Sequence, residues 1–457
     1  MPNTTPAPRR LARLAALAAV AAGSAAAGCG DILEVDNPNN VNVEALSNPA
    51  SAPNQVNGVL AALTRGAHQL TGHLVTISDE MTWSGSLDFM NQLNRGSVRD
   101  PYNEFITDAA SGMSTARYMA DRTIKQLEEF QAARTLTDPV QLALANLYGA
   151  VTYDYLANGF DNFVVNSDRQ EGGPAVGPDK MAVLYDSADA MATRALAIAP
   201  ASNALLRGQI LAVRARARYD KAVWQKLNPS GRVPADPLVN VQGAVDDATA
   251  ALPLLGADGR LALTVVTGMS YGNCFLPSCT NSRREIAFNP LYGSYAYTTT
   301  RTLTVNLRDP ISNQPDPALA ALMTEFVTGT NNNNQFTNLV VTGARDMRLI
   351  LAEAALSRGN TAEFTAQINA LRALNSKPAW TGAAGQPSAR DLLLHERRVN
   401  LYLQGRRLND MYRFGVKDPE WSAQSDAATC PGSLFPIVDA ERQTNANVAD
   451  VQPGCGQ

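Results

Sequence analysis

Residues 388–415 read SARDLLLHERRVNLYLQGRRLNDMYRFG, and this stretch decides the fold. Ser388 and Asp391 predict a capped helix start, because a Ser at this position accepts a hydrogen bond from the amide three residues later. Leucines, Val399 and Tyr402 follow at helical spacing and predict one apolar helix face. Gly405 then permits a break, and a second short helix is expected beyond it.

The charged residues of this stretch predict an ion-pair corner between the two helices. Arg407 and Asp410 lie three residues apart, so they share one face of the second helix. There they can pair with each other, or with Glu396 and Arg397 across the turn. We expect this corner to be structural and not to bind a ligand.

The same stretch resembles the C-terminal signature of the SusD/RagB family, surface lipoproteins that capture nutrients for TonB-dependent outer-membrane transporters. The resemblance is carried by Glu396, Arg397, Arg398, Gly405, Arg407, Asp410, Arg413 and Gly415. Asn400 and Gln404 depart from the family pattern, which usually has acids there. The resemblance therefore implies the family fold, with a smaller buried charge network.

The first 28 residues have the features of an export signal. Three arginines precede an Ala/Leu-rich run, and small residues lead up to Gly28 and Cys29. The run is too short and too weakly apolar to span a bilayer in the mature protein. The Gly28–Cys29 step fits a lipobox, so Cys29 is the expected lipid anchor on the outer membrane at the cell surface. Simple cleavage after Ala27 is the alternative.

Charge and cysteine content narrow the possible partners. The chain has 38 basic and 42 acidic residues, and the signal contains three arginines and no acids, so the mature chain has 35 basic residues and a net charge of −7. No basic surface is left to hold nucleic acid. Besides Cys29 four cysteines remain, and an even number in an exported chain suggests disulfides. We favour Cys274 with Cys279 and Cys430 with Cys455, because each pair is local; free buried thiols are the alternative.

Helical periodicity dominates the middle of the chain. Ala-rich segments of paired length near the ~34 residues of a tetratricopeptide repeat predict a mainly α fold, a tetratricopeptide-like helical-repeat superhelix. A second, irregular lobe containing short strands is expected where β-branched, Gly, Asn and Tyr residues gather, with strands at Leu261–Thr267 and Thr298–Leu307. The expected regions are a signal peptide (1–28), a lipid-anchored tether (29–50), a helical-repeat region (51–259), the irregular insertion (260–340) and a C-terminal SusD/RagB region (341–457).

One motif formally suggests a hydrolase. Residues 268–272 fit G-x-S-x-G, but that motif needs a helix directly after Ser270, and Cys274 and Pro277 follow instead. The nearest downstream base is His395, inside the ion-pair corner. We therefore expect no enzymatic activity, and a secreted serine hydrolase remains only a weak alternative.

Metal and cofactor motifs are incomplete. His395 and Glu396 begin an H-E-x-x-H helix, but Val399 replaces the second histidine. His68 and His73 are five residues apart and do not lie one helical turn from each other. No phosphate-binding Gly loop with a Lys occurs, so no cofactor and no transition-metal site are expected; a calcium site elsewhere stays open.

The remaining functional pattern in the sequence indicates a surface that binds a sugar or a peptide. Sugars present flat apolar faces and many hydroxyls, so their sites combine exposed aromatic rings with polar side chains at the edge. Trp83 lies in a Gly/Ser-rich segment that we interpret as a loop, with Asn94 and Arg95 close by. The family resemblance implies further ligand residues in the irregular insertion, where the candidates are Tyr271, Tyr292 and Tyr295. Packing in the core is the alternative for each.

Together these features predict a non-catalytic surface lipoprotein. It would hold an oligosaccharide or peptide nutrient over a SusC-like TonB-dependent outer-membrane barrel and release it inward, as the family resemblance implies. A helical-repeat scaffold lipoprotein that binds only protein is the main alternative. The sequence does not identify the nutrient.

Overall fold

The computed structural model describes residues 43–165, 172–268, 270–272, 274–297, 301–448 and 454–455. The chain divides into two units, Met1–Asn48 and Pro49–Gln457. The described part of the first unit contains the short helix α2 (Val43–Leu46). The expected signal peptide and Cys29 lie outside the described residues, and all features below belong to the second unit.

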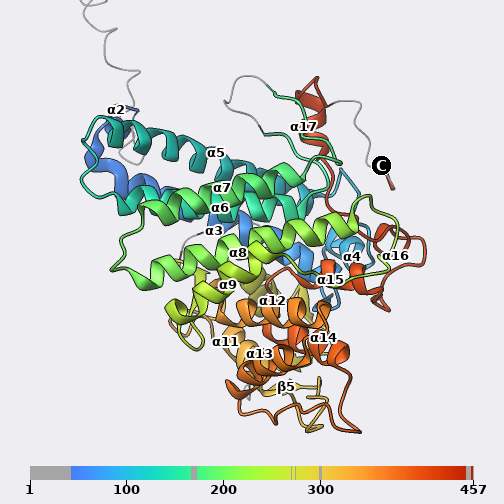
Figure 1. Cartoon of the computed structure of the whole chain (residues 1–457). Coiled ribbons are helices and arrows are strands. Elements are labelled where there is room, and N and C mark those ends of the chain that lie inside the picture. The colour runs from blue at the N-terminus through green and yellow to red at the C-terminus, as the bar shows by residue number, and fades with distance from the viewer. Residues whose placement is uncertain are drawn as a thin grey trace, which may run out of the picture. The chain divides into compact units, whose positions relative to one another are not determined.

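Pairs of helices that pack along each other form most of the second unit. The pairs are α3 (Ala52–Ile77) with α5 (Glu104–Ala132), α6 (Val140–Gly159) with α7 (Ala182–Ile198), α8 (Ala204–Leu227) with α9 (Gln242–Leu255), and α12 (Ala344–Ser357) with α13 (Thr361–Ala373). Each pair also packs on the next, through α5 on α6, α7 on α8 and α9 on α12 (Figure 1). This arrangement confirms the predicted mainly α, tetratricopeptide-like stack.

Small residues let these helices approach closely. A Cβ added to Gly66 of α3 would lie 2.8 Å from the backbone carbonyl carbon of Gly112 in α5, so a larger residue would force the two helices apart. Helix α6 is buried at every position from Gly149 to Gly159. A helix that is buried all round lies inside its domain, and α6 accordingly forms the centre of the stack.

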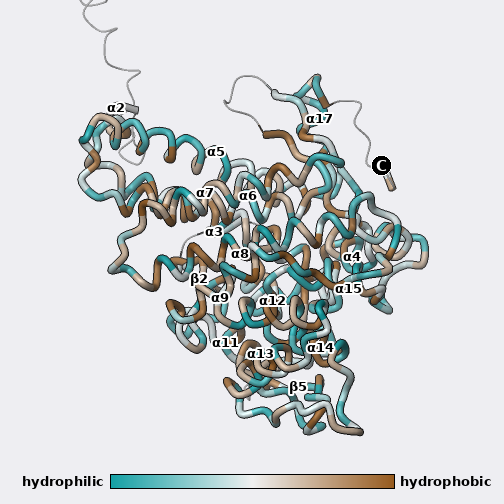
Figure 2. The backbone as a smooth tube through the Cα atoms, in the orientation of Figure 1, coloured by the Kyte–Doolittle hydropathy of each residue, from teal (hydrophilic) through white to brown (hydrophobic). Residues whose placement is uncertain are grey.

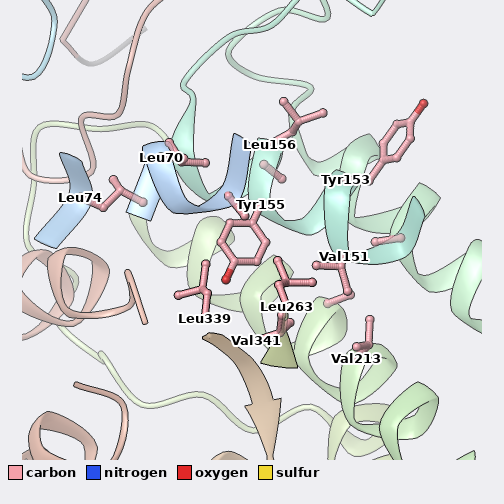
Figure 3. Packing of buried hydrophobic residues seen from close by; sticks show 14 of the residues in the cluster. Leu70, Leu74, Val151, Tyr153, Tyr155, Leu156, Val213, Leu263, Leu339 and Val341 are labelled. Atoms are coloured by element: carbon pink, nitrogen blue, oxygen red, sulfur yellow. The ribbon is translucent and has the colours of Figure 1, made fainter. Parts of the chain in front are cut away.

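The core lies between the helix stack and a small sheet. Figure 2 shows hydrophobic and hydrophilic residues mixed along the helices of the stack. The close view in Figure 3 shows side chains of α3, α6 and α8 meeting the strands at Leu263, Leu339 and Val341. The helical part and the strand-containing part therefore share one continuous core.

Three two-stranded antiparallel sheets complete the core and the insertion. They pair β1 (Met81–Trp83) with β3 (Ile286–Phe288), β2 (Arg260–Leu263) with β6 (Leu339–Gly343), and β4 (Gly293–Tyr295) with β5 (Leu303–Val305). The short strands of the insertion were predicted, but β2 and β5 are shorter than expected from their β-branched runs. The predicted loop around Trp83 is wrong in part, because its first residues form β1 and a helix α4 (Asp88–Asn94) follows.

A further helix was not predicted inside the insertion. Helix α11 (Pro317–Thr328) begins at Asp316, whose side chain accepts hydrogen bonds from two following amides, and Pro317 occupies the first turn. Both are ordinary helix-start signals. These helix-start signals were overlooked because the sequence around them is rich in Gly and Asn.

The C-terminal corner consists of two helices, as predicted. Helix α14 (Ala389–Asn400) is capped by Ser388, whose Oγ accepts a hydrogen bond from the Asp391 amide at 3.1 Å. The chain then turns through Gly405 at φ +70°, a left-handed conformation that favours glycine, into α15 (Arg407–Phe414). The remaining short elements are η1 (Pro49–Ser51), α10 (Leu276–Ser278), the π-helical turn η2 (Cys279–Arg283), α16 (Asp426–Thr429) and α17 (Asp439–Thr444).

Two disulfides are present, Cys274–Cys279 and Cys430–Cys455, in the pairing that the sequence favours. The first closes the turn before β3, and the second ties the end of the chain to the segment after α16. Within the described ranges, no helix is both long enough and apolar enough to cross a membrane.

Candidate functional site

The predicted ion-pair corner is present, with partners that differ in part from those expected. Asp410 accepts hydrogen bonds from Nε of Arg397 at 2.8 Å and from Nη2 of Arg413 at 2.8 Å. Burial alone would raise the pKa of Asp410, but these two guanidinium groups outweigh it and lower the pKa to about 2. Arg413 also pairs with Glu353 of α12, so the corner is joined to the helix stack.

Arg407 does not pair with Asp410, which corrects one of the expected alternatives. Its guanidinium makes two hydrogen bonds, of 2.8 and 2.7 Å, to the carboxylate of Asp79, which follows α3. The first turn of α15 therefore faces the end of α3, while Asp410 faces α14. Because both arginine pairs are buried, the corner holds distant parts of the chain together and offers no open ligand surface.

Glu396 belongs to a separate buried cluster. Its carboxylate contacts Arg372 at 2.6 Å and Lys377 at 2.7 Å, and Lys377 also contacts Asp316. Atoms of Asp309, His395 and Glu396 lie within 4.8 Å of one another, a grouping that can suit a metal ion. The two acids of that group are already paired with cations, so its chemistry is that of an ion-pair cluster.

The residues of the weak hydrolase alternative are not arranged as a nucleophile and base. Ser270 is exposed, and the next helix, α10, begins only at Leu276. Nε2 of His395 contacts a carboxylate oxygen of Asp316 at 2.8 Å within the buried cluster. The structure thus gives His395 a partner other than Ser270.

Asn94 lies in the predicted ligand region, but its side chain makes hydrogen bonds within the protein. Its Oδ1 accepts a hydrogen bond from the Trp83 amide at 3.0 Å, and its Nδ2 donates to Glu420. Glu420 also accepts from the Thr82 hydroxyl. With 5% of its surface exposed, Asn94 fixes the end of β1 and has little surface for a ligand.

Two of the three candidate tyrosines are core residues. The Tyr292 ring is fully buried, and its hydroxyl donates to Asp79 and accepts from Arg398, each at 2.8 Å. Tyr271 is 7% exposed and stacks on Phe275 with ring centres 4.7 Å apart. Their assignment as ligand residues is therefore corrected to packing, which was the alternative for each.

The third tyrosine, Tyr295, lies in a half-buried aromatic group. Its ring meets that of Tyr297 edge to face at 4.7 Å, and the Arg284 guanidinium lies 4.8 Å from the centre of the Tyr297 ring. Arg284 is joined to the end of β1, because the Ser84 hydroxyl donates to its carbonyl oxygen at 3.1 Å. Trp83 directly precedes Ser84, is the last residue of β1 and is partly exposed.

The Ser84–Arg284 hydrogen bond and the Arg284–Tyr297 contact join the end of β1 to the insertion. We call this surface the β1–β3 face, and it comprises Trp83, Ser84, Arg284, Tyr295 and Tyr297. It combines aromatic rings, a hydroxyl and a guanidinium, which are the groups that recognise sugars and polar peptides. Arg95, by contrast, is exposed and donates to Ser422 on the segment before α16.

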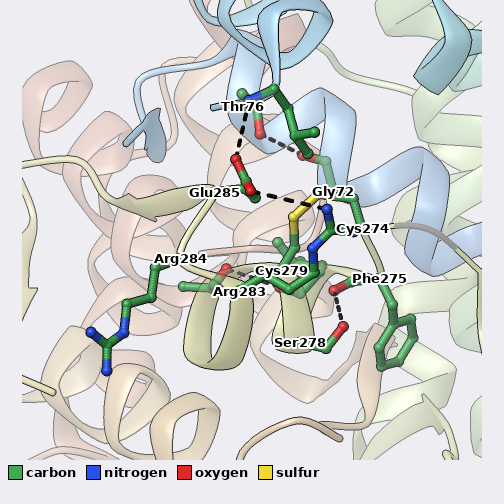
Figure 4. The surroundings of a disulfide bond; sticks show 12 residues. Gly72, Thr76, Cys274, Phe275, Ser278, Cys279, Arg283, Arg284 and Glu285 are labelled. Carbon is green, nitrogen blue, oxygen red and sulfur yellow. Dashed lines mark hydrogen bonds and ion pairs between the residues drawn. A yellow bond between two sulfur atoms is a disulfide. The ribbon is translucent and has the colours of Figure 1, made fainter. Parts of the chain in front are cut away.

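The loop after Trp83 is held by Glu285. One carboxylate oxygen of Glu285 accepts hydrogen bonds from the amides of Ser86 and Leu87 at 2.7 and 3.1 Å. A Cβ on Gly85 would lie 2.1 Å from that oxygen, so only glycine fits. Figure 4 shows Glu285 and Arg283 beside the Cys274–Cys279 disulfide, with the Arg284 side chain directed away from it. The disulfide-closed turn thus lies directly before the residues of the β1–β3 face.

Sequence reasoning missed Arg284 and Glu285 as part of this face. Arg284 has a left-handed backbone, φ +59°, which carries no sequence signal in a non-glycine residue. The pairing of β1 with β3 joins residues about 200 positions apart, as the contact of Ser84 with Arg284 illustrates. Local patterns contain no information on such a pairing.

The protein is a stack of helix pairs, and its insertion supplies an aromatic and polar surface. These features define a class of protein, a helical-repeat protein with a candidate ligand face. Residues 292–430 match the model of the SusD family. This region contains the ion-pair corner and most of the second half of the insertion. No curated protein matches the chain in sequence.

Solved structures share the fold over nearly the whole chain. A SusD homolog from Bacteroides thetaiotaomicron has 17% identity and a TM-score of 0.62, over 89% of this chain and 98% of that chain. A SusD-like carbohydrate binding protein from Bacteroides vulgatus has 14% identity and a TM-score of 0.57, over 89% and 98%. A laminarin binding SusD-like protein has 14% identity and a TM-score of 0.50, over 87% and 98%. The chain therefore shares the fold of these SusD-like proteins, and its residues 292–430 match the SusD family.

Proposed function

We propose that this protein is a cell-surface lipoprotein that binds an oligosaccharide or peptide nutrient and delivers it to a SusC-like TonB-dependent barrel in the outer membrane. Lipid on Cys29 would anchor it, and residues 29–50 would act as the tether. The names of two structurally similar proteins, one carbohydrate binding and one laminarin binding, favour an oligosaccharide over a peptide.

The observation that carries the proposal is the β1–β3 face. A sugar ring can stack its apolar side on Trp83 or Tyr295, while its hydroxyls bond to Ser84 and to the Arg284 guanidinium. The Glu285 hydrogen bonds fix the loop before a ligand arrives, so little conformational entropy is lost on binding. The proposal requires binding and release only, and it assigns no bond-breaking step to the protein.

The test compares two substitutions of Trp83 with a matched control. Trp83→Ala removes the ring, whereas Trp83→Phe keeps a smaller aromatic face. The indole N–H that Trp83→Phe also removes has no hydrogen-bond partner among the described residues. Trp224→Ala on α8 truncates another partly buried tryptophan at a separate site. Because stacking contributes about 0.5 to 1.5 kcal/mol beyond burial, Trp83→Ala should weaken binding several-fold, with a smaller effect of Trp83→Phe and none of Trp224→Ala.

Calorimetry with laminarin oligosaccharides, maltooligosaccharides and a tryptic peptide mixture measures these affinities. Ligand and barrel co-purified from native membranes extend the test to the natural nutrient. Normal binding by a folded Trp83→Ala protein would contradict the role of the β1–β3 face. A wild-type protein that retains a barrel partner but binds no small ligand would instead support a scaffold lipoprotein.

A further inference from the structure

A polar cleft lies away from the β1–β3 face, between α11, the β2–β6 sheet and the end of α14. Its volume is about 270 Å³. A smaller hollow of about 50 Å³ adjoins it, and both are lined by Leu322, Glu325, Val340 and Gln404. The smaller hollow has room for a few water molecules, and the larger one has room for a small ligand.

Two buried polar side chains at these hollows lack partners within the described part of the chain. Gln404 is 6% exposed; its Nε2 donates to the Asn400 carbonyl at 3.2 Å, but its Oε1 accepts no hydrogen bond. His68, which lines the smaller hollow, is 2% exposed, and neither ring nitrogen has a partner. Burial lowers the pKa of His68 to about 3, so the ring is neutral. Leaving buried polar atoms unpaired is costly, which favours a polar occupant.

The charged groups that line the cleft all have ion-pair partners, and one of them, Asp346, pairs with Arg216. Arg260 makes two hydrogen bonds to Glu325, of 2.9 and 2.7 Å. Arg345 makes two of 2.7 Å to Asp258, and its third nitrogen donates to Asn400 Oδ1 at 3.1 Å. Each arginine thus has a carboxylate partner, and these pairs contribute no net charge.

This charge balance selects against an ionic ligand. An anion that approached either arginine would be repelled by the carboxylate of Glu325 or Asp258, and a cation that approached either carboxylate would be repelled by its arginine. Neutral hydroxyls can instead use the lone pairs and N–H groups that a bidentate pair leaves available. The aliphatic side chains of Leu322 and Leu401 offer contact to C–H groups. A volume below the roughly 300 to 1,000 Å³ typical of drug-sized ligands implies a smaller molecule.

We propose that this cleft binds a neutral polyhydroxylated molecule of the size of one sugar unit, with one of its hydroxyls donating to Oε1 of Gln404. This site is separate from the β1–β3 face and does not depend on the function proposed for that face. The smaller hollow would hold water that bridges the ligand to His68.

The test blocks the cleft with a large side chain introduced at an exposed residue that lines it. Ala321 is an exposed residue of α11 at the cleft, so Ala321→Trp blocks the cleft without altering the core. Thr324→Trp places the same side chain at another exposed position of α11 that does not line the cleft. A second variant, Gln404→Met, removes the unpaired acceptor at similar volume. The probes are D-glucose, D-galactose, D-mannose, D-xylose and myo-inositol, observed by ligand-detected NMR at millimolar concentration.

At least one probe should bind the wild type and Thr324→Trp equally, and Ala321→Trp should abolish its binding. Gln404→Met should weaken it by about ten-fold. Repeating the series in a Trp83→Ala background separates this site from the β1–β3 face. The proposal is overturned if none of the probes binds the wild type, if binding survives Ala321→Trp, or if it disappears with Trp83→Ala alone. Tight binding of an amino acid or phosphate that Ala321→Trp abolishes would also overturn it, because the ligand would then be charged.

Discussion

Glu80 is a buried carboxyl at the junction of α3 and β1. It is 1% exposed, and its Oε1 accepts a hydrogen bond from the Leu403 amide at 2.9 Å. Burial raises the pKa of Glu80 to about 8; the Leu403 hydrogen bond opposes this shift, and the neighbouring Asp79 adds to it. The neighbouring Arg407 pairs with Asp79, so Glu80 has no ion-pair partner among the described residues.

The raised pKa makes the stability of the protein depend on pH. Between the ordinary value of 4.5 and about 8, folded Glu80 holds a proton that the unfolded chain releases. The free energy of unfolding therefore falls as pH rises through this window, by roughly 1.4 kcal/mol per pH unit at most. Glu80→Gln keeps an acceptor for Leu403 and cannot ionise. Urea denaturation should show that this variant loses less stability over the window and is more stable than the wild type above it.

Asp410→Asn is the control for that measurement, because the pKa of Asp410 is shifted in the opposite direction to that of Glu80. Burial opposes ionisation of Asp410, but Arg397 and Arg413 lower its pKa from 3.8 to about 2. Its contribution is therefore present at neutral pH and is lost as pH falls toward 2. Asp410→Asn should destabilise the protein at neutral pH, where Glu80→Gln does not. Parallel pH profiles for the wild type and Glu80→Gln would contradict the raised pKa.

At the scale of elements, the ion pairs of the corner differ in burial from those on the helix surfaces. Arg407→Ala leaves Asp79 buried with less compensation, because Arg398 at 3.4 Å and the Tyr292 hydroxyl at 2.8 Å then remain as its partners. Breaking a buried pair in this way costs about 3 to 5 kcal/mol. Lys221→Ala breaks an exposed pair with Asp186, which should cost about 0 to 1 kcal/mol. Thermal and urea unfolding of the two variants measures the difference.

The same variants separate structural from functional roles. At temperatures where Arg407→Ala is folded, it should bind oligosaccharide at the β1–β3 face like the wild type. An Arg407→Ala protein that melts like the wild type but has lost ligand binding would make the corner a functional site.

Much of the helical architecture is encoded locally and was predictable. Ser388 and Gly405 mark the beginning and the end of the corner because capping and left-handed turns depend on one or two side chains. Tyr292 was not distinguishable from a surface tyrosine, because its partners Asp79 and Arg398 lie far away in sequence. Tyr271 packs on Phe275 nearby, but also on the distant Phe336. Arg407 was correctly placed in a structural corner, but its partner Asp79 lies 328 positions earlier and left no local signal.

At the scale of the whole molecule, the proposed attachment to the membrane rests on one residue outside the described ranges, Cys29. Because lipid chains gain about 0.8 kcal/mol for each buried CH₂ group, several chains on Cys29 would give stable attachment. Cys29→Ala should move the protein from the membrane fraction to the soluble fraction, as measured by fractionation and immunoblotting. Depletion of the barrel partner is the control, because it removes any retention through protein contact. Membrane retention of Cys29→Ala in depleted cells would contradict the anchor.

The long-range ion pairs also bear on the order in which the chain is synthesised and folds. Asp79 is synthesised 328 residues before Arg407, and Asp220 is synthesised 186 residues before Arg406. Until those arginines emerge, the N-terminal helices must keep acids in water that the finished fold buries. We infer that this delay holds the chain in an unfolded, export-competent state until translation is nearly complete. A chain that ends at Pro387 should accordingly unfold without a cooperative transition in circular dichroism, and cooperative melting of that fragment would show that the helices complete their folding before the last arginines arrive.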